Sequence, residues 1–377
     1  MRVEEFIKVL GVDFFTGVPD SCLKPLCNYL MDRYGISKQH VIAANEGNCT
    51  ALAAGYHLAT GKIPLVYMQN SGIGNVINPV ASLMHKEVYG IPCIYVVGWR
   101  GEPGVHDEPQ HIYQGKVTVS LLEEMGIHTC VVDRDFEVAD VQKAMKNFTP
   151  VLQAGGNVAF VIRKGALSYD GNIEYQNQYP MQREEIIKHI IRYTEDSPVI
   201  ATTGKISREL YENRTSEGQG HQFDFLTVGS MGHCSSIALG IAMQHQNARI
   251  WCIDGDGSAL MHMGAMAVIG SSGQQNLVHI VINNSAHETV GGMPTVADRI
   301  QLTEIAKGCG YSHVYRVDDF ESLDQILMEA KNAGELFFIE IKSAIGSREN
   351  LGRPATAAID NKKEFMQYLN TKFDYSF

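Results

Sequence analysis

The chain has 377 residues, which favours two or three domains, and its 36 glycines suit α/β domains with many tight turns between strands and helices. The formal net charge is −11, which argues against nucleic acid or an anionic membrane surface as a partner. Eight cysteines without Cys-x-x-Cys spacing, no signal-peptide pattern and no apolar run of about 18 residues predict a reduced, soluble, cytoplasmic protein without membrane spans.

The first 168 residues alternate short apolar runs with amphipathic stretches. Runs that indicate buried parallel strands lie at 12–16, 41–44, 64–68, 92–98, 128–132 and 157–162. Helical patterns lie at 3–10, 22–34 and 49–56. This alternation predicts an α/β domain with a doubly wound parallel sheet.

Two acidic residues follow the first two of these strands. Asp20 stands in Gly17-Val18-Pro19-Asp20-Ser21, and it is either the cap of the next helix or a carboxylate held at the mouth of a site. Glu46 opens a helix of small residues, where it either complements the helix dipole or is a buried carboxylate whose pKa is raised by loss of solvent. The sequence leaves both interpretations open for each residue.

A long loop rich in glycine and proline follows the strand at 92–98. Its titratable residues are Arg100, Glu102, His106, Asp107, Glu108 and His111. Such a density of titratable groups is more than a connection needs, which indicates a functional loop. A solvated surface loop is the alternative interpretation, because loops are polar in any case.

Residues 169–182 lack hydrophobic periodicity and are rich in Asn, Gln and Tyr with single Gly and Pro residues, which predicts a linker. A second α/β domain is expected over 183–377, with a helix at 183–193 and strands at 198–202, 249–253, 277–282 and 336–341. Its Gly-containing tail carries Arg348 and Arg353. These two arginines either grip a dianion bidentately or belong to a solvated loop.

Polar residues end two strands of this second domain, at Asp254-Gly255-Asp256-Gly257 and at Asn283-Asn284. The carboxyl ends of strands in an open α/β sheet meet at one edge, so Asp256 and Asn284 are expected to lie together there. Their oxygen ligands suit Mg²⁺, and the glycines beside Asp256 let phosphates approach the backbone. An EF-hand is excluded because Ala265 stands where that loop needs Glu, whereas a plain turn remains the alternative.

These motifs resemble the thiamine-diphosphate-dependent decarboxylases. Gly255-Asp256-Gly257 with Asn283-Asn284 is similar to the cofactor signature of that family, and Asn45-Glu46 is similar to the segment with its activating glutamate. The resemblance implies a pyrimidine-binding domain at 1–168, a linker at 169–182 and a diphosphate-binding domain at 183–377. The middle domain of larger members is absent.

Within the family the chain looks most like the compact members that decarboxylate phosphonopyruvate. The segments that carry this closer likeness are Gly17-Val18-Pro19-Asp20-Ser21, Gly98-Trp99-Arg100-Gly101, Asp107-Glu108-Pro109-Gln110-His111 and the tail with Arg348 and Arg353. Members that decarboxylate sulfopyruvate are similar in layout but are commonly split into two chains.

The resemblance also implies roles for individual residues. Glu46 would activate the aminopyrimidine of thiamine diphosphate, while Asp256, the Asn284 side chain and the Ala286 carbonyl would hold Mg²⁺ against the diphosphate. Further implied cofactor contacts are Thr203, Gly204, Gly229, Ser230, Met231, Gly255, Gly257 and Ser258. The candidates for proton transfer are Asp20, His106 and His111, and those for binding the anion of the substrate are Arg100, Arg348 and Arg353.

The implied activity is that of a carboxy-lyase of phosphonate biosynthesis, which converts 3-phosphonopyruvate into phosphonoacetaldehyde and CO₂ with thiamine diphosphate and Mg²⁺. The bond next to the ketone breaks only if its electrons have a sink, which the thiazolium ring supplies. The family also implies a homodimer or larger homo-oligomer with active sites at subunit interfaces. The alternatives are decarboxylation of sulfopyruvate, another decarboxylase or carboligase with the same cofactor, and a partner subunit that binds the cofactor without catalysis.

Overall fold

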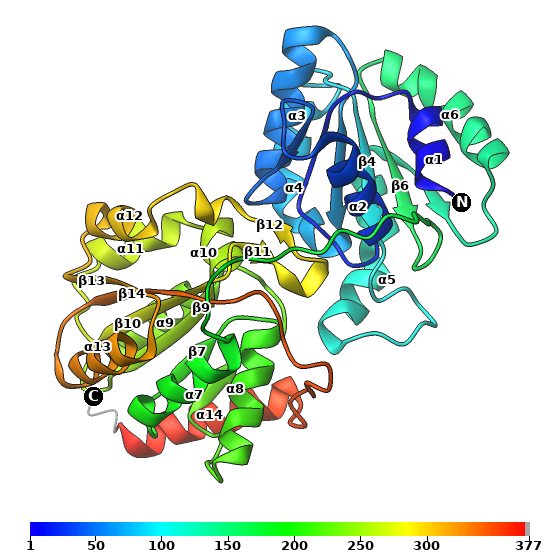
Figure 1. Cartoon of the computed structure of the whole chain (residues 1–377). Helices are drawn as coiled ribbons and strands as arrows, with labels where there is room; N and C mark the ends of the chain where they lie inside the picture. Colours follow the sequence, from blue (N-terminus) through cyan, green and yellow to red (C-terminus); the bar gives the residue numbers. More distant parts are fainter. Residues whose placement is uncertain (374–377) are drawn as a thin grey trace. The chain divides into compact units, whose positions relative to one another are not determined.

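The computed structural model describes residues 1–373, and the chain forms two compact units (Figure 1). The first comprises residues 1–174 with 290–293, and the second comprises residues 175–289 with the chain from 294 onward. Each unit contains one six-stranded sheet in which every pair of neighbouring strands is parallel. Within the described residues, no helix is both long and apolar enough to span a membrane.

The sheet of the first unit has the strand order β2-β1-β3-β4-β6-β5. Its strands are β1 (Phe15–Gly17), β2 (His40–Ile42), β3 (Leu65–Gln69), β4 (Cys93–Gly98), β5 (Ile127–Val132) and β6 (Asn157–Ile162). Its helices are α1 (Val3–Leu10), α2 (Lys24–Tyr34), α3 (Glu46–Thr60), α4 (Ile73–Pro79), α5 (Pro109–Glu124) and α6 (Val138–Gln153), with short helical turns at Asn70–Gly72 and Val80–Met84. In Figure 1, α1 and α6 lie on one face of the sheet and α3 and α4 on the other. Both faces are therefore covered. The central strands β3, β4 and β6 are apolar and buried except for the half-buried Gln69 and the buried Asn157 at their ends.

The sheet of the second unit has the strand order β13-β14-β10-β9-β7-β8. Its strands are β7 (Val199–Ala201), β8 (Asp224–Leu226), β9 (Ile250–Gly255), β10 (Leu277–Asn283), β13 (His313–Val317) and β14 (Phe337–Lys342). Its helices are α7 (Arg183–Thr194), α8 (Lys205–Ser216), α9 (Cys234–Gln244), α10 (Asp256–Met261), α11 (Gly264–Ser271), α12 (Leu302–Cys309), α13 (Phe320–Asn332) and α14 (Ala358–Lys372). Shorter elements are β11 (Ala286–His287), β12 (Met293–Pro294) and turns at Glu288–Val290 and Val296–Asp298.

The core of the second unit joins its sheet to the helices α7, α8 and α13. Trp251 and Ile253 on β9, Ile280 on β10 and Ile339 on β14 are 0% exposed and pack in one cluster with the apolar side chains of these helices. Burial of this apolar surface fixes the central strands, and with them the positions of the loops at their carboxyl ends.

The predicted fold class is confirmed, because both sheets are parallel and each carries helices from an α/β alternation. Two strands of the second sheet, β8 and β13, were not predicted from the sequence. Strand β8 has only three residues, and β13 lies at the edge of the sheet, where His313, Val314 and Tyr315 are half-buried. Neither therefore gives the continuous apolar run that indicates a central parallel strand.

Candidate active site

The candidate residues of the first unit lie at the carboxyl ends of neighbouring strands. Asp20 follows β1, Glu46 follows β2 and Arg100 follows β4, while Gln69 is the last residue of β3. These four strands are consecutive in the sheet. Because the strands are parallel, their carboxyl ends meet at the edge where α/β proteins bind ligands.

Glu46 is a buried carboxyl group at the beginning of α3. The helix is capped by Asn45, whose side chain accepts a 2.9 Å hydrogen bond from the Asn48 amide, so Glu46 lies in the first turn. Its Oε2 atom accepts a 2.6 Å hydrogen bond from Asn75 Nδ2. A Cβ atom on Gly72 would stand only 2.5 Å from Glu46 Cγ, so the glutamate packs directly on a glycine. Burial raises the pKa of Glu46, and the Asn75 hydrogen bond offsets this only in part.

Asp20 is completely buried and is not the cap of α2, which Leu23 precedes. Its Oδ2 atom accepts a 2.9 Å hydrogen bond from the Cys22 amide, and its Oδ1 atom accepts a 2.7 Å hydrogen bond from Gln69 Nε2. A Cβ atom on Gly98 would clash with Asp20 Oδ2, so this carboxylate also packs on a glycine. Burial raises the pKa of Asp20 against the opposing effect of its hydrogen bonds and a nearby arginine. Asp20 is therefore a carboxyl group held at the sheet edge.

Arg100 forms an ion pair within its own loop. Its Nε and Nη2 atoms donate to the two carboxylate oxygens of Asp107, at 2.8 and 2.5 Å, and Nη1 donates to Ser21 Oγ at 3.1 Å. Asp107 also accepts from the amides of Gly101 and Glu108, each at 2.8 Å. Burial alone would raise the pKa of Asp107, but these hydrogen bonds and the arginine charge hold it well below its usual range. The positive charge of Arg100 is thus already paired.

The two histidines of this loop differ in setting. His106 is exposed, whereas His111 is half-buried. The loop is shorter than the sequence predicts, because α5 begins at Pro109 and places His111 in its first turn. Proline at the first helical position is the sequence signal that marks this start. Burial and the Arg100 charge lower the pKa of His111, and its Nδ1 atom has no hydrogen-bond partner within residues 1–373.

In the second unit, Asp256 and Asn284 follow two neighbouring strands, as the sequence predicts. Asp256 directly follows β9 and Asn284 directly follows β10, and Gly255 pairs with Ile282 in the register between them. Asp256 is 3% exposed, and its Oδ2 atom accepts a 2.5 Å hydrogen bond from Thr295 Oγ1. Burial raises the pKa of Asp256 to about 6.

The Asn284 side chain is held in one orientation. Its Nδ2 atom donates to Glu288 Oε2 at 2.8 Å, and its Oδ1 atom accepts from the Ala286 amide at 3.1 Å. The Asn284 carbonyl accepts a 3.0 Å hydrogen bond from Asn177. Because an amide oxygen has two lone pairs, Oδ1 keeps one for a further ligand.

The backbone around Gly257 is closely packed by two side chains. A Cβ atom on Gly257 would stand 3.2 Å from Met231 Cε and 3.4 Å from the His287 ring. The next residue, Ser258, accepts a 3.0 Å hydrogen bond from the Gly232 amide and forms a 2.9 Å hydrogen bond with Thr202 Oγ1. The start of α10 is therefore fastened to the loops that follow β7 and β8.

These two loops adopt backbone conformations that few residues tolerate. After β7, Thr203 Oγ1 donates to the Val228 carbonyl at 2.9 Å, and Gly204 has a φ of +94°. After β8, Gly229 precedes Ser230, whose φ of +55° is uncommon for a residue with a Cβ atom. Strained backbone of this kind persists where the surrounding structure holds it, and it concentrates at functional sites.

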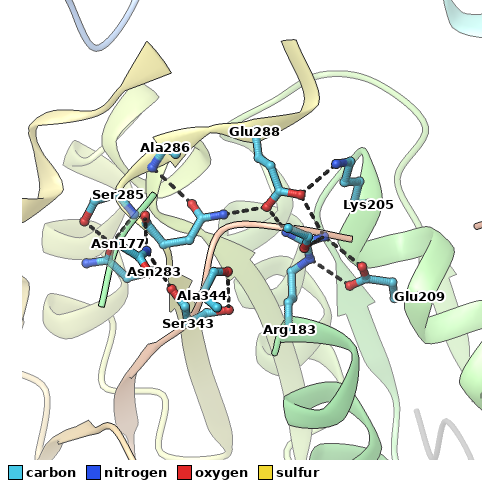
Figure 2. Close-up of polar contacts among 12 residues, drawn as sticks. Asn177, Arg183, Lys205, Glu209, Asn283, Ser285, Ala286, Glu288, Ser343 and Ala344 are labelled. Atoms are coloured by element: carbon cyan, nitrogen blue, oxygen red, sulfur yellow. Dashed lines mark hydrogen bonds and ion pairs between the residues drawn. The ribbon is translucent and has the colours of Figure 1, made fainter. Parts of the chain in front are cut away.

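A network of charged side chains supports Asn284 and was not predicted from the sequence (Figure 2). Glu288 accepts from Arg183 Nη1 at 2.6 Å, from Lys205 Nζ at 2.7 Å and from Asn284 Nδ2 at 2.8 Å. Arg183 also donates to both carboxylate oxygens of Glu209, at 2.7 Å each. The side chains of Arg183, Glu209 and Glu288 are 6%, 1% and 9% exposed, so these charges are buried.

Glu288 stays ionised in this network. Burial alone would raise its pKa, but the charges and hydrogen bonds of Arg183 and Lys205 lower it overall. A signal for the network was present, since Arg183 begins α7, where the helix dipole disfavours a cation. Its acidic partners lie far away in the sequence, however, and could not be identified without the fold.

The two tail arginines follow β14. Arg348 Nε donates to Glu184 Oε1 at 2.9 Å, Arg348 Nη1 donates to Asn350 Oδ1 at 3.2 Å, and the guanidinium also pairs with Glu212. Arg353 is exposed. Like Arg100, Arg348 is therefore engaged with carboxylates of its own unit.

The residues at the edge of the second sheet fit a magnesium diphosphate. Asp256 offers a buried carboxylate whose raised pKa shows that its negative charge is poorly compensated, which a divalent cation would correct. Asn284 offers an amide oxygen, and Gly257 places no Cβ atom of its own between the backbone and a phosphate. Hard oxygen ligands beside such backbone are the set that Mg²⁺ with a phosphate group requires.

Comparison with known proteins gives a consistent result over both units. The family described as "Thiamine pyrophosphate enzyme, N-terminal TPP binding domain" matches residues 2–129, and "Thiamine pyrophosphate enzyme, C-terminal TPP binding domain" matches residues 202–341. These domains bind thiamine diphosphate, with Mg²⁺ as the usual metal.

Two individual relatives match almost the whole chain, and a third matches less than half of it. Phosphonopyruvate decarboxylase of Streptomyces viridochromogenes is 30% identical over 96% of this chain and 92% of its own length. Sulfopyruvate decarboxylase of Methanosarcina acetivorans is 26% identical over 98% of this chain and 97% of its own length. The beta subunit of sulfopyruvate decarboxylase from Methanothermobacter thermautotrophicus is 35% identical over 40% of this chain and 77% of its own length.

Replacing Asp256 with Asn is expected to stabilise the protein free of cofactor at pH 7–8 by about 1–3 kcal/mol. The reason is that a pKa raised to about 6 makes the ionised, buried carboxylate unfavourable. Asp256 contributes stability that is fully present below about pH 4 and is lost as the pH rises through about 6, so the variant should gain nothing in acid. Urea unfolding at several pH values measures this difference.

In the same variant, the rise in melting temperature that Mg²⁺ and thiamine diphosphate give the natural protein should disappear. Asp298→Asn, at an exposed position of the same unit, is the matched control. A variant that is less stable than the natural protein at pH 7 without cofactor, or that the cofactors stabilise equally, would contradict the assigned role of Asp256.

Replacing Glu288 with Gln is expected to weaken the affinity for Mg²⁺ and thiamine diphosphate by about 10–100-fold, since groups that orient a metal ligand have effects of this size. The substitution removes the charge that Arg183 and Lys205 pair with and loosens the Asn284 amide. Turnover at saturating cofactor should change by only a few-fold, because Glu288 contacts the candidate ligand Asn284 and would act only by orienting it. Titration calorimetry and cofactor-dependent kinetics separate the two effects. Glu304→Gln, which breaks an exposed ion pair with Lys307, is the control, and unchanged cofactor affinity in Glu288→Gln would disprove the positioning role.

Proposed function

The chain belongs to the thiamine-diphosphate-dependent decarboxylases, and on that premise we propose that it converts 3-phosphonopyruvate into phosphonoacetaldehyde and CO₂. The main support for this substrate is the 30% identity with a phosphonopyruvate decarboxylase over nearly the full length of both chains. The proposed enzyme is a carboxy-lyase of phosphonate biosynthesis that uses thiamine diphosphate and Mg²⁺.

Glu46 is proposed to supply the proton that activates the cofactor. When bound, thiamine diphosphate supplies the electron sink that lets the bond to the carboxylate break. Glu46 suits this task because burial raises its pKa, which favours the protonated carboxyl group. Asn75 holds Oε2, and Gly72 leaves space for the rest of the side chain. The proton is proposed to reside on Oε1, which is not occupied by Asn75.

Asp20 is the preferred candidate for returning a proton to the product. Its pKa is raised by burial, which favours a protonated carboxyl group that can act as an acid. Burial and the Arg100 charge lower the pKa of His111, which favours the neutral imidazole and makes this residue a poorer proton donor. His106 is exposed, and it would have to be brought to the site by the loop.

Asp256, Asn284 and the Ala286 carbonyl are proposed to hold Mg²⁺. Proposed cofactor contacts come from the loops after β7 and β8, the end of β9 and the start of α10, namely Thr203, Gly204, Gly229, Ser230, Met231, Gly255, Gly257 and Ser258. We further propose that the enzyme is a homodimer or a larger homo-oligomer, with active sites at subunit interfaces. Light scattering that gives the mass of a single chain in the active preparation would contradict this assembly.

The anion of the substrate is proposed to be bound by Arg100, Arg348 and Arg353. Arg100 and Arg348 already pair with carboxylates, which reduces the net positive charge that they offer to a dianion. A monoanionic sulfonate needs fewer cations than a phosphonate. Together with the 26% identity to a sulfopyruvate decarboxylase over 98% of the chain, this makes sulfopyruvate the second candidate substrate.

The decisive experiment mixes the purified protein with thiamine diphosphate, Mg²⁺ and, separately, phosphonopyruvate, sulfopyruvate or pyruvate, and measures the release of CO₂ and aldehyde. Phosphonopyruvate is expected to give the highest kcat/KM. Glu46→Gln should lose about 10²–10⁴-fold in turnover, the usual contribution of acid–base catalysis, while calorimetry still detects cofactor binding. Glu5→Gln, at an exposed position on α1, should keep full activity.

Each other outcome has a definite meaning. A preference for sulfopyruvate would overturn the substrate and leave the cofactor chemistry in place. Release from none of the three 2-oxo acids would favour another decarboxylase or carboligase reaction, or a partner subunit without catalysis of its own. Full activity of Glu46→Gln would remove Glu46 from the mechanism.

Arg353→Ala is expected to raise the KM for phosphonopyruvate by about 10–100-fold, because a charge-assisted hydrogen bond to the substrate contributes roughly 1.5–3 kcal/mol. The melting temperature should not change, since this arginine is exposed. Arg33→Ala, at an exposed position on α2, controls for a general loss of positive charge. Steady-state kinetics measures the KM for phosphonopyruvate, and an unaltered KM would exclude Arg353 from substrate binding.

A further inference from the structure

A second group of possible metal ligands lies inside the second unit. Cys252 and Asp254 are alternate residues of β9, and His279 on β10 is the register partner of Cys252. The three side chains therefore stand on one face of two adjacent strands. Cys234 is the first residue of α9, and this helix packs against β9. All four residues are at most 1% exposed.

Two polar atoms of this group lack hydrogen-bond partners. Within residues 1–373, neither Asp254 Oδ2 nor His279 Nε2 makes a hydrogen bond, although both are completely buried. They face each other at 3.7 Å, which is too long for a hydrogen bond. Buried polar atoms are nearly always satisfied, and the exceptions commonly mark an absent ion or water.

The distances suit a tetrahedral cation bound by two cysteines. The sulfur atoms of Cys234 and Cys252 are 3.7 Å apart. Two thiolates at about 2.3 Å from a tetrahedral Zn²⁺ are separated by roughly 3.8 Å. Potential ligand atoms of Cys234, Cys252 and Asp254 all lie within 4.8 Å of one another. In the described part of the chain, this is the one group of three or more His, Cys, Asp and Glu side chains that meets this condition.

The orientation of His279 fits the role of a ligand. Its Nδ1 atom lies 3.0 Å from the hydroxyl of Tyr311. An Nδ1–H that donates to this hydroxyl leaves the lone pair of Nε2 directed at Asp254. Metal-binding histidines usually donate their other ring N–H in this way.

We propose that Cys234, Cys252, Asp254 and His279 form a site for a divalent cation of the zinc class, separate from the magnesium site at Asp256 and Asn284. Sulfur and nitrogen ligands select such a cation, whereas Mg²⁺ prefers oxygen ligands. Binding converts two thiols into thiolates and releases two protons, so the four ligands and Zn²⁺ together carry one negative charge. The cation joins the first turn of α9 to the centre of β9 through Cys234, Cys252 and Asp254, and a small movement of His279 on β10 toward them fills the fourth position. Four protein ligands give the cation a structural role.

The test measures metal in the untagged protein by elemental analysis. The protein is incubated with one equivalent of Zn²⁺ in excess Mg²⁺, and free metal is then removed by gel filtration. About one Zn²⁺ per chain is expected. The Co²⁺-substituted protein should absorb in the near ultraviolet through sulfur-to-metal charge transfer. Neither measurement depends on turnover or on the proposed function.

Variants locate the bound metal. Cys234→Ser with Cys252→Ser should reduce the zinc content at least about tenfold, because sulfur ligands dominate the affinity for this cation. Cys130→Ser with Cys309→Ser, at two half-buried cysteines outside the group, should retain it. Asp256→Asn should also retain it, which separates this site from the magnesium site.

Two results would overturn the proposal. The first is a natural protein with less than about 0.1 Zn²⁺ per chain after this treatment, which would mean that the two thiols form a simple S–H···S contact in the core. The second is a Co²⁺ protein without sulfur charge transfer, which would place the metal elsewhere. Both results come from the natural sequence, so they stand even if the double cysteine variant does not fold.

Discussion

The burial of carboxyl groups at the ends of parallel strands is the constraint on which the candidate site depends. Parallel sheets are covered on both faces, so residues at the carboxyl ends of their strands are enclosed by the loops and helices that follow. Asp20, Glu46 and Asp256 are each at most 4% exposed as a result. Loss of solvent raises the pKa of all three. The same effect suits the proposed proton donors, Asp20 and Glu46, and the proposed metal ligand, Asp256.

The structure handles this burial differently at different positions. Glu288 pairs with two cations, Arg183 and Lys205, and stays ionised, whereas Glu46 accepts a hydrogen bond from a neutral side chain, Asn75. The first arrangement favours a fixed charge that orients a neighbour, and the second favours a group that can exchange a proton. The number and charge of the partners thus separate supporting residues from candidate acids, although all of them are buried carboxylates.

The fold and the ends of the central strands could be predicted because they depend on patterns of residues that are adjacent in the sequence. Apolar runs followed by Asp256 or Glu46 need no knowledge of distant residues. The pairing of Arg183 with Glu288 could not be predicted, because 105 positions separate them in the chain. Arg100 and Asp107 are only seven residues apart, but the irregular loop between them carries no periodicity from which its path follows. Local pattern therefore gives the candidate ligands, and three-dimensional packing decides which charges remain available.

Glu46 on Gly72 and Asp20 on Gly98 show one consequence for how this protein can evolve. In both cases the acid occupies the space in which a side chain on the glycine would stand. Each glycine can therefore be substituted only after the acid has been lost or has moved. The effect of a substitution at one position of each pair thus depends on the residue at the other, which is epistasis. The acid and the glycine of each pair therefore constrain each other's substitution. A substitution of either glycine requires an earlier change of the acid, and at Gly98 it also requires a small shift of the Cys22 Cβ atom, which would lie 3.2 Å from the new side chain.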